Sequence, residues 1–318
     1  MPGGPGRNSY DGVLLINKPL HRSSHDVVQS LRRILSERRI GHVGTLDPLA
    51  EGLLVVCVGR STKIVRFLTG LDKTYEAEIT LGRTSTTLDS EGVDRSCPAA
   101  PVTDLTEAAV TDVLTRFEGL VTQQVPAYSA VRVNGEPLYK TARRGEEVEL
   151  PMREITISEI HFQTFENPRL RVMVSCSSGT YIRTLADDIG RALGCGAYLS
   201  HLRRTRVGHF DLAAAMTLEQ VADAEADGSL QRYLLGYGDV LRFGALRVTD
   251  EFKPFVIQGR TPANSDLDGC EGRFAPGDTV LLKGTDGSVL AVGRSGVSSD
   301  NLRAATEHRV FDYIRVLN

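Results

Sequence analysis

One uninterrupted apolar run, LLVVCV at residues 53–58, constrains the fold of this chain more than any other feature. A run of strand length without alternation is typical of a strand covered on both faces, which places it inside a sheet. Residues 12–16 (GVLLI) predict a second buried strand, and YEAEITL at 75–81 alternates as a half-buried strand does. Further strands are expected at 154–163, 169–176 and 206–212. These patterns predict a mixed α/β domain built around a sheet.

A helix is predicted between the strands at 12–16 and 53–58. Ser23 and Asp26 have the spacing of a capping box, and apolar residues then recur at helical intervals. Gly41 is expected to end this helix.

Two further helices are predicted later in the chain. The first is an acidic amphipathic helix at 104–118, followed much later by a helix at 182–193 that Gly194 ends. Between the strand at 75–81 and the acidic helix, residues 84–101 are polar and rich in turn formers. The residues expected to face inward from the acidic helix are Leu105, Ala108, Ala109, Val113, Leu114 and Phe117.

The chain changes character near its C-terminal end. From about Phe252, short β runs alternate with Gly, Asp and Pro, which predicts a small β-barrel-like domain. We therefore expect a mobile Gly- and Pro-rich tail at 1–9, a large domain at 10–245 and the small domain at 246–318.

The cysteines argue against two kinds of fold. Five cysteines are an odd number, and no two of them have C-x-x-C spacing, which disfavours a disulfide framework and a zinc site. The N-terminal residues lack a signal-peptide core, and no apolar run approaches the length of a membrane span. A cytoplasmic location is therefore expected.

The most informative motif is GHVGTLDPLAEGLL at residues 41–54, a glycine-rich loop before the buried strand. It contains Asp47, followed by Pro48. Asp-Pro commonly begins a turn, so these residues by themselves favour a turn carboxylate over a catalytic one. A phosphate-binding P-loop is excluded, because G-x-x-x-x-G-K-[ST] occurs nowhere in the sequence.

This motif resembles the catalytic motif of the TruB family, the bacterial tRNA pseudouridine-55 synthases. The resemblance continues through NKP, SSHDVV, STK, KTY, GRTSTTLDSEG, VPAYSAVRVNGEPLYKTARRGEEVELPMREI and SSGTYIRTLADDIGRALGCGAYLSHLRRTRVG. These blocks keep their order over roughly residues 12–210. The resemblance implies a pseudouridine synthase fold with a mixed, largely antiparallel sheet and a C-terminal PUA-like β-barrel domain that contacts RNA.

The family reaction detaches a flipped-out uracil from C1′ at N1, turns it and rejoins it through C5. By resemblance, Asp47 is the essential catalytic carboxylate, and neither a cofactor nor a metal is needed. Whether Asp47 attacks C1′ or removes a sugar proton on the way to a glycal stays open.

The resemblance also implies a set of substrate-binding residues. Tyr75 would pack on the flipped base, and Arg183 would line the pocket and pair with Asp47. From the residues alone, Tyr75 fits a strand core position, whereas a cation in the first turn of a helix, such as Arg183, is poorly placed against the helix dipole and favours a specific partner. The remaining members of the implied set are His42 at the flipped nucleotide, Tyr181 in the pocket, Leu202 as an apolar wall and Lys63 as a nearby cation.

The expected substrate is the T-arm of tRNA, bound by a monomer that needs neither a membrane nor an obligatory protein partner. One alternative is an RNA-binding or tRNA-folding chaperone that acts without turnover. Another is a related synthase that acts on a different RNA, with protein partners or a guide RNA.

The net charge of −3 at first argues against an RNA partner. The sum hides a separation, because residues 22–66 and 181–209 carry +4 and +3, whereas residues 84–118 and 211–239 carry −5 each. We therefore expect the two basic segments to form one face around Asp47 and the two acidic segments to lie away from it. The arginines at 203, 204 and 206 are expected to contact phosphates or support the fold.

Overall fold

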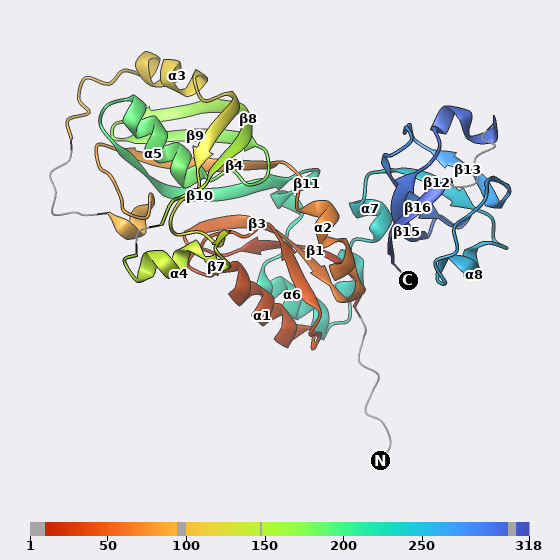
Figure 1. The fold of residues 1–318 in the computed structure, drawn as a ribbon. Helices are drawn as coiled ribbons and strands as arrows, with labels where there is room; N and C mark the ends of the chain where they lie inside the picture. Colours follow the sequence, from red (N-terminus) through yellow and green to blue (C-terminus); the bar gives the residue numbers. More distant parts are fainter. Residues whose placement is uncertain (1–9, 94–99, 147, 305–309, 318) are drawn as a thin grey trace.

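The computed structural model describes residues 10–93, 100–146, 148–304 and 310–317 (Figure 1). The mobile tail predicted at 1–9 lies outside the described residues. Two β-sheets organise the chain, a large one in the first domain and a smaller one in the C-terminal part.

The large sheet has nine strands in the order β1-β3-β10-β4-β9-β8-β5, with β2 added to β3 and β11 to β10. The pair β10–β3 is parallel, and the other pairs are antiparallel, so the predicted mixed, largely antiparallel sheet is confirmed. The strands are β1 (Gly12–Lys18), β2 (Ile40–Val43), β3 (Ala50–Val58), β4 (Lys73–Leu81), β5 (Gly119–Gln124), β8 (Met152–Glu166), β9 (Arg169–Cys176), β10 (Ala197–Val207) and β11 (Phe210–Asp211). A separate short hairpin is made by β6 (Arg132–Val133) and β7 (Glu136–Pro137).

Strand β3 lies between β1 and β10 and is buried almost throughout, as its uninterrupted apolar run predicts. Strand β4 alternates buried and partly buried residues, as expected for one covered face. The strand predicted at 206–212 is wrong, because the chain forms β10 before it and only the short β11 after a turn. Strand β10 has two register shifts, which interrupt its period-two pattern and hide it in the sequence.

Helix α1 (Ser24–Ile34) begins with the predicted capping box of Ser23 and Asp26. The prediction that Gly41 ends this helix is wrong. The helix stops at Ile34, Ser36 adopts a left-handed φ of 50°, and Gly41 already belongs to β2. Glycine is therefore not needed for the reversal that follows α1.

Helix α3 (Glu107–Thr115) is shorter than predicted, and Ala108 and Ala109 are exposed rather than inward-facing. Val110 is buried in their place. Helix α5 (Ile182–Ala192) agrees with its prediction and is followed by Gly194 at a φ of 74°. The other helices are α2 (Val65–Leu68), α4 (Leu138–Arg143), α6 (Leu218–Ala226), α7 (Tyr237–Val240) and α8 (Lys253–Val256).

The C-terminal sheet has five strands in the order β13-β12-β14-β15-β16. They are β12 (Gly244–Val248), β13 (Leu267–Glu271), β14 (Thr279–Lys283), β15 (Val289–Ser295) and β16 (Phe311–Val316). This sheet packs on the first domain through one apolar cluster, which joins Leu53 and Leu68 to Leu281 and Val292.

Two observations bear on the remaining sequence expectations. Cys57, Cys176, Cys195 and Cys270 are free thiols. Among the described residues, no helix is long and apolar enough to cross a membrane.

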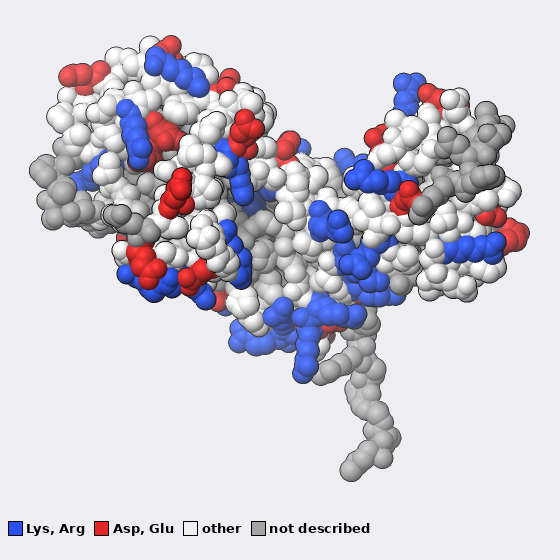
Figure 2. Space-filling view, in the orientation of Figure 1, with Lys and Arg blue, Asp and Glu red and all other residues white. Residues whose placement is uncertain are grey.

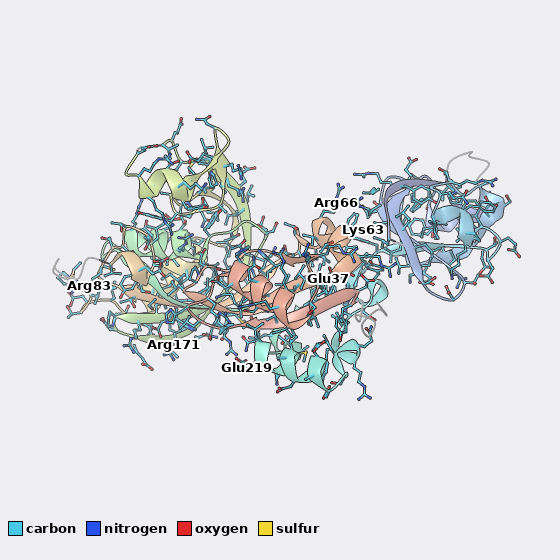
Figure 3. The ribbon with its side chains drawn as sticks, turned by 90° about the horizontal axis from the view of Figure 1, so that it is seen from below. Glu37, Lys63, Arg66, Arg83, Arg171 and Glu219 are labelled. Atoms are coloured by element: carbon cyan, nitrogen blue, oxygen red, sulfur yellow. The ribbon has the colours of Figure 1, made fainter. Side chains whose placement is uncertain are left out.

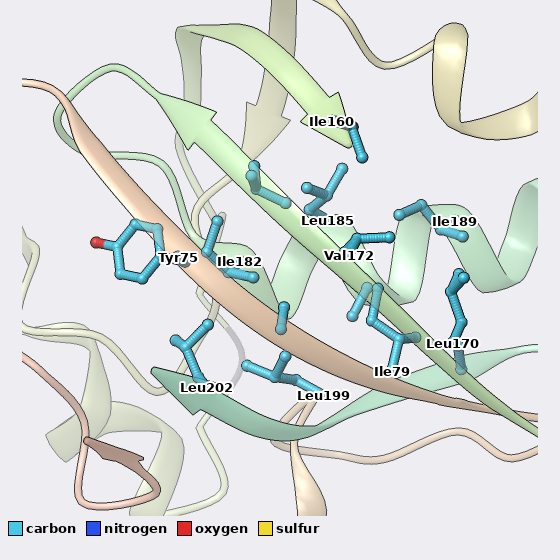
Figure 4. Packing of buried hydrophobic residues seen from close by; sticks show 14 of the residues in the cluster. Tyr75, Ile79, Ile160, Leu170, Val172, Ile182, Leu185, Ile189, Leu199 and Leu202 are labelled. Atoms are coloured by element: carbon cyan, nitrogen blue, oxygen red, sulfur yellow. The ribbon is translucent and has the colours of Figure 1, made fainter. Parts of the chain in front are cut away.

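Helix α5 and the large sheet enclose an apolar core that ends at Tyr75 (Figure 4).

Candidate active site

The loop at residues 44–49 connects β2 to β3 and carries Asp47. Two side chains hold its backbone in place. Arg204 Nη2 donates to the Gly44 carbonyl over 3.0 Å, while Ser24 Oγ accepts from Leu46 N at 2.8 Å and donates to Leu46 O at 3.0 Å. The loop closes when Ala50 N donates to the Asp47 carbonyl over 3.0 Å. These contacts place Asp47 before any substrate binds, which lowers the cost of reaching a reactive geometry.

Asp47 faces a cavity of about 810 Å³, within the range of small-molecule sites. Its walls come from the Asp47 loop, β4, β10, the start of α5 and the segment that contains α4. Lining residues that bear on the chemistry are Asp47, Lys73, Tyr75, Asp89, Glu91, Tyr128, Tyr139, Arg143, Arg153, Tyr181, Arg183, Leu202 and Arg204.

Arg183 lies between two carboxylates of this cavity. Its Nε is 3.2 Å from Asp47 Oδ2, and its Nη1 is 3.8 Å from Asp89 Oδ2. The contact with Asp47 is an ion pair without hydrogen-bond geometry, because Arg183 Nε has no hydrogen-bond partner. The Asp47 side chain keeps 43% of its surface exposed, against 6% for Arg183. Asp47 therefore faces a buried cation on one side and is still open to the cavity.

The start of α5 positions Arg183. Tyr181 is the N-cap residue, and its backbone N–H donates to Gln123 Oε1 over 2.8 Å, while Gln123 Nε2 donates back to the Tyr181 carbonyl. Arg183 Nη2 donates to the Tyr128 carbonyl over 2.9 Å. The helix start is thus tied both to β5 and to the segment before α4. The sequence predicts a specific partner for Arg183 in the first turn of this helix, and that partner is Asp47.

Tyr75 and Leu202 form the apolar side of the cavity. Both are 8% exposed, and they lie on the neighbouring strands β4 and β10. In Figure 4 the Tyr75 ring stands at the end of the apolar core beside Ile182 and Leu202, with its hydroxyl pointing away from that core. Burial raises the pKa of the Tyr75 phenol, which therefore stays protonated at neutral pH. The ring offers a flat surface on which a base could stack.

Two buried lysines lie near the Asp47 loop. Burial lowers the pKa of Lys18 to about 8, although the charges of Asp47 and Glu51 oppose the shift. Burial, with the charge of Arg204, also lowers the pKa of Lys73 to about 8. Both ammonium groups donate to backbone carbonyls, Lys18 to Pro19 and Arg22, and Lys73 to Thr69 and Leu71. The protein thus surrounds the loop with positive charge held by carbonyl dipoles.

His42 and Lys63 are not among the residues that line this cavity. His42 lies on β2, next to the loop but outside the cavity wall. Lys63 Nζ donates to the Val316 carbonyl over 3.3 Å, so it bridges to the C-terminal sheet, and Figure 3 shows it on that side of the first domain. Asp47, Tyr75, Tyr181, Arg183 and Leu202 do meet in the cavity.

We expect His42 to be neutral at pH 7. Its pKa is lowered chiefly by burial and also by the charges of Arg204 and His25, and its Nδ1 is buried without a hydrogen-bond partner. The pKa of His42 is lower in the folded protein than in the unfolded chain, where it is about 6.5. The neutral imidazole therefore contributes fully to the free energy of unfolding above that pH, and this contribution is lost as the pH falls through the folded-state pKa. An NMR titration of the imidazole should give a pKa below 6.5. A value above that number would contradict the expectation.

One part of the predicted charge separation is contradicted by the structure. Figure 2 shows Lys and Arg side chains gathered over α1 and toward the C-terminal domain. However, the acidic segment at 84–118 does not lie away from Asp47, because its Asp89 and Glu91 line the same cavity. That part of the prediction is wrong, since Asp89 faces the buried Arg183 guanidinium and accepts a hydrogen bond from Glu91 N over 3.0 Å.

Sequence reasoning missed several residues of this cavity. Asp89 lies in the polar turn segment and in the GRTSTTLDSEG block without a predicted role, and Lys73 and Arg204 are not among the predicted pocket residues. A usable signal existed for Lys73, which stands two residues before Tyr75 and so points to the same face of β4. Arg143 and Arg153 reach the cavity from segments that carry no comparable pattern.

Three family models match consecutive parts of this chain. Residues 32–182 match the N-terminal domain of TruB family pseudouridylate synthases, residues 183–241 match the C-terminal domain of tRNA pseudouridylate synthase B, and residues 244–317 match the PUA domain. The chain is 39% identical over 296 residues to tRNA pseudouridine synthase B of Syntrophus aciditrophicus, covering 92% of this chain and 93% of that protein. The protein of the same name from Cupriavidus metallidurans is 42% identical, with 91% of each chain covered.

Solved structures include proteins with the fold described above. The chain superposes on the crystal structure of a Cbf5-Nop10-Gar1 complex with a TM-score of 0.76 and 26% identity, covering 96% of this chain and 85% of that one. An H/ACA RNP bound to a substrate RNA containing 2′-deoxyuridine gives the same TM-score at 24% identity. With its fold, its cavity and its sequence in agreement, the chain belongs to the TruB family of pseudouridylate synthases.

Proposed function

We propose that this protein converts uridine 55 in the T-arm of tRNA to pseudouridine, with Asp47 as the catalytic carboxylate. The single observation that carries the proposal is the Asp47–Arg183 ion pair, set in a cavity whose other wall is Tyr75. The name of the relatives, tRNA pseudouridine synthase B, supports tRNA as the substrate.

The chemistry requires a uridine out of its stack. Unstacking costs a few kcal/mol, and contacts inside the cavity must offset this cost. In the proposed complex the base packs on Tyr75, and Leu202 and Tyr181 enclose it. The cavity is large enough for one nucleotide, because its volume is about 810 Å³.

Asp47 then acts at the sugar. The C1′–N1 bond breaks, and its electron pair leaves with the uracil. The base then rejoins C1′ through C5, which gives up its proton, while N1 takes up a proton. Asp47 either bonds to C1′ or removes a sugar proton, and in both cases it must be ionised. Arg183 is the cation that pairs with this carboxylate, with its Nε 3.2 Å from Asp47 Oδ2. His42 and Lys63 stay proposed RNA contacts outside the cavity.

The rest of the RNA would lie along the first domain and the C-terminal domain. Phosphate contacts from basic side chains position an RNA without reading its sequence. We propose that the protein acts as a cytoplasmic monomer of two domains. Residues 10–245 form the catalytic domain, and residues 246–318 form the RNA-binding PUA-like domain. No cofactor or metal enters this reaction.

Site-resolved pseudouridine mapping tests the proposal. A mixture of unmodified tRNA transcripts is incubated with the purified protein, and pseudouridine is expected at position 55 alone. Product at another position would favour a related synthase with a different RNA target, and product that appears only with an added guide RNA would favour a guided enzyme. Faster tRNA folding without any product would favour a chaperone.

Binding of tRNA should depend steeply on salt despite the negative net charge. We expect the affinity to fall on the order of 10²-fold between 50 and 200 mM salt, as for about four released counterions. The slope is measured by fluorescence anisotropy with labelled tRNA. Arg143→Ala, in the cavity, should reduce the slope by about one, whereas Arg116→Ala, at the exposed C-cap of α3, should not. A flat salt dependence would contradict a phosphate-binding face.

A further inference from the structure

Arg204 is the largest fully buried side chain of the described residues, with 1% of its surface exposed. It lies on β10 with Gly52 of β3 on one side and Tyr75 of β4 on the other. Gly52 has a φ of 98°, and a Cβ built there would be only 2.4 Å from the Arg204 carbonyl oxygen. The β3 backbone therefore passes close to Arg204, directly after the Asp47 loop.

The Arg204 guanidinium connects two backbone segments of the site. Its Nε donates to the Leu53 carbonyl over 2.7 Å, and its Nη2 donates to the Gly44 carbonyl over 3.0 Å. Tyr75 is its cross-strand neighbour on β4, and both side chains line the cavity. One side chain thus bonds the beginning of the Asp47 loop and the strand that follows the loop, and lies beside the residue that forms the apolar cavity wall.

A purely structural role accounts poorly for a charge in this place. The Arg204 charge acts on Lys73 and on His42, and in both cases it opposes protonation. Burying a cation beside other cationic groups is costly, and a well-packed apolar side chain would stabilise the same core at lower cost. The planar guanidinium of an arginine can donate to several acceptors in fixed directions. Neither an apolar side chain nor a lysine can do this.

We propose that Arg204 is a positioning residue of the isomerisation, which holds the Gly44 end of the Asp47 loop and the Tyr75 side chain in one fixed relation. It acts through Asp47 and Tyr75 and does not itself react. The kinetic part of this inference rests on the proposed function, whereas the claim that Arg204 holds the loop does not.

Arg204→Lys tests the inference, because it keeps the charge and loses the fork. We expect kcat for pseudouridine formation to fall on the order of 10²-fold, the cost of a small displacement of a catalytic group, while KM for tRNA changes little. Amide hydrogen exchange in peptides that cover residues 44–50 should become about tenfold faster or more, as for loss of one charge-assisted hydrogen bond. Arg171→Met is the matched control, since this exposed arginine of the same sheet pairs with Glu78 (Figure 3).

A second variant keeps the test decisive if the lysine packs badly. Arg204→Ala should regain part of its lost rate when methylguanidinium is added, and methylammonium should not replace it. A double-mutant cycle with Tyr75→Phe should give a combined loss smaller than the product of the single losses.

Several outcomes would overturn the proposal. These are wild-type kcat and unchanged exchange in Arg204→Lys, a loss of rate that appears only as a raised KM, or a variant that fails to fold and is not rescued by guanidinium. If wild-type protein makes no pseudouridine at position 55, the proposed function fails, and the exchange measurement alone decides whether Arg204 holds the loop.

Discussion

Asp47→Asn is expected to lower kcat for pseudouridine formation by on the order of 10⁴-fold or more, the loss typical of removing an essential catalytic group. The amide has nearly the shape of the carboxylate, so the loop contacts of Gly44 and Leu46 remain. It carries no negative charge, however, and can neither bond to C1′ nor accept a sugar proton. The rate is measured under single-turnover conditions on a T-arm RNA, with product quantified by mass spectrometry.

Binding serves as the internal control for this prediction. Asp47→Asn should bind tRNA within about threefold of the wild-type affinity, because phosphate contacts supply most of the binding free energy. Asp223→Asn, an exposed residue of α6, should leave both rate and affinity unchanged. Wild-type turnover in Asp47→Asn would refute the catalytic role of Asp47.

Arg183→Met is expected to damage activity and stability together. It removes the cation that pairs with Asp47, which should lower kcat by about 10²- to 10³-fold, comparable to the loss of one strong electrostatic contact. It also leaves Asp89, whose side chain is 6% exposed, without its opposite charge. Removing one partner of a buried pair costs about 3 kcal/mol or more. Urea unfolding and single-turnover kinetics measure the two effects.

Two further variants separate charge from geometry at this position. Arg183→Lys keeps the cation but cannot reach Asp47, Asp89 and the Tyr128 carbonyl together, so we expect it to recover stability more than rate. Arg116→Met removes an exposed arginine paired with Asp112 and should change the free energy of unfolding by less than about 1 kcal/mol. Equal loss in Arg116→Met and Arg183→Met would show that the buried pair has no special role.

The site could be predicted to different extents for different residues. The motif at 41–54 and the GTYIR block predict Asp47 and Arg183 by resemblance. The structure places Arg183 Nε 3.2 Å from Asp47 Oδ2. Asp89 lies in the GRTSTTLDSEG block of the same resemblance, but no role is assigned to it there. Its importance depends on a loop that folds back so that its carboxylate approaches Arg183, and nothing in the local sequence reports that approach.

By itself, the sequence determined the local structure wherever one periodicity ran undisturbed. The apolar run in β3, the alternation in β4 and the capping box of α1 each express a physical rule that acts over a few residues. Only the tertiary structure decided the position of β10, because two register shifts break its pattern, and with it the burial of Arg204 against the Asp47 loop. Contacts between strands far apart in the chain depend on the whole sheet, and such contacts leave no period in the sequence.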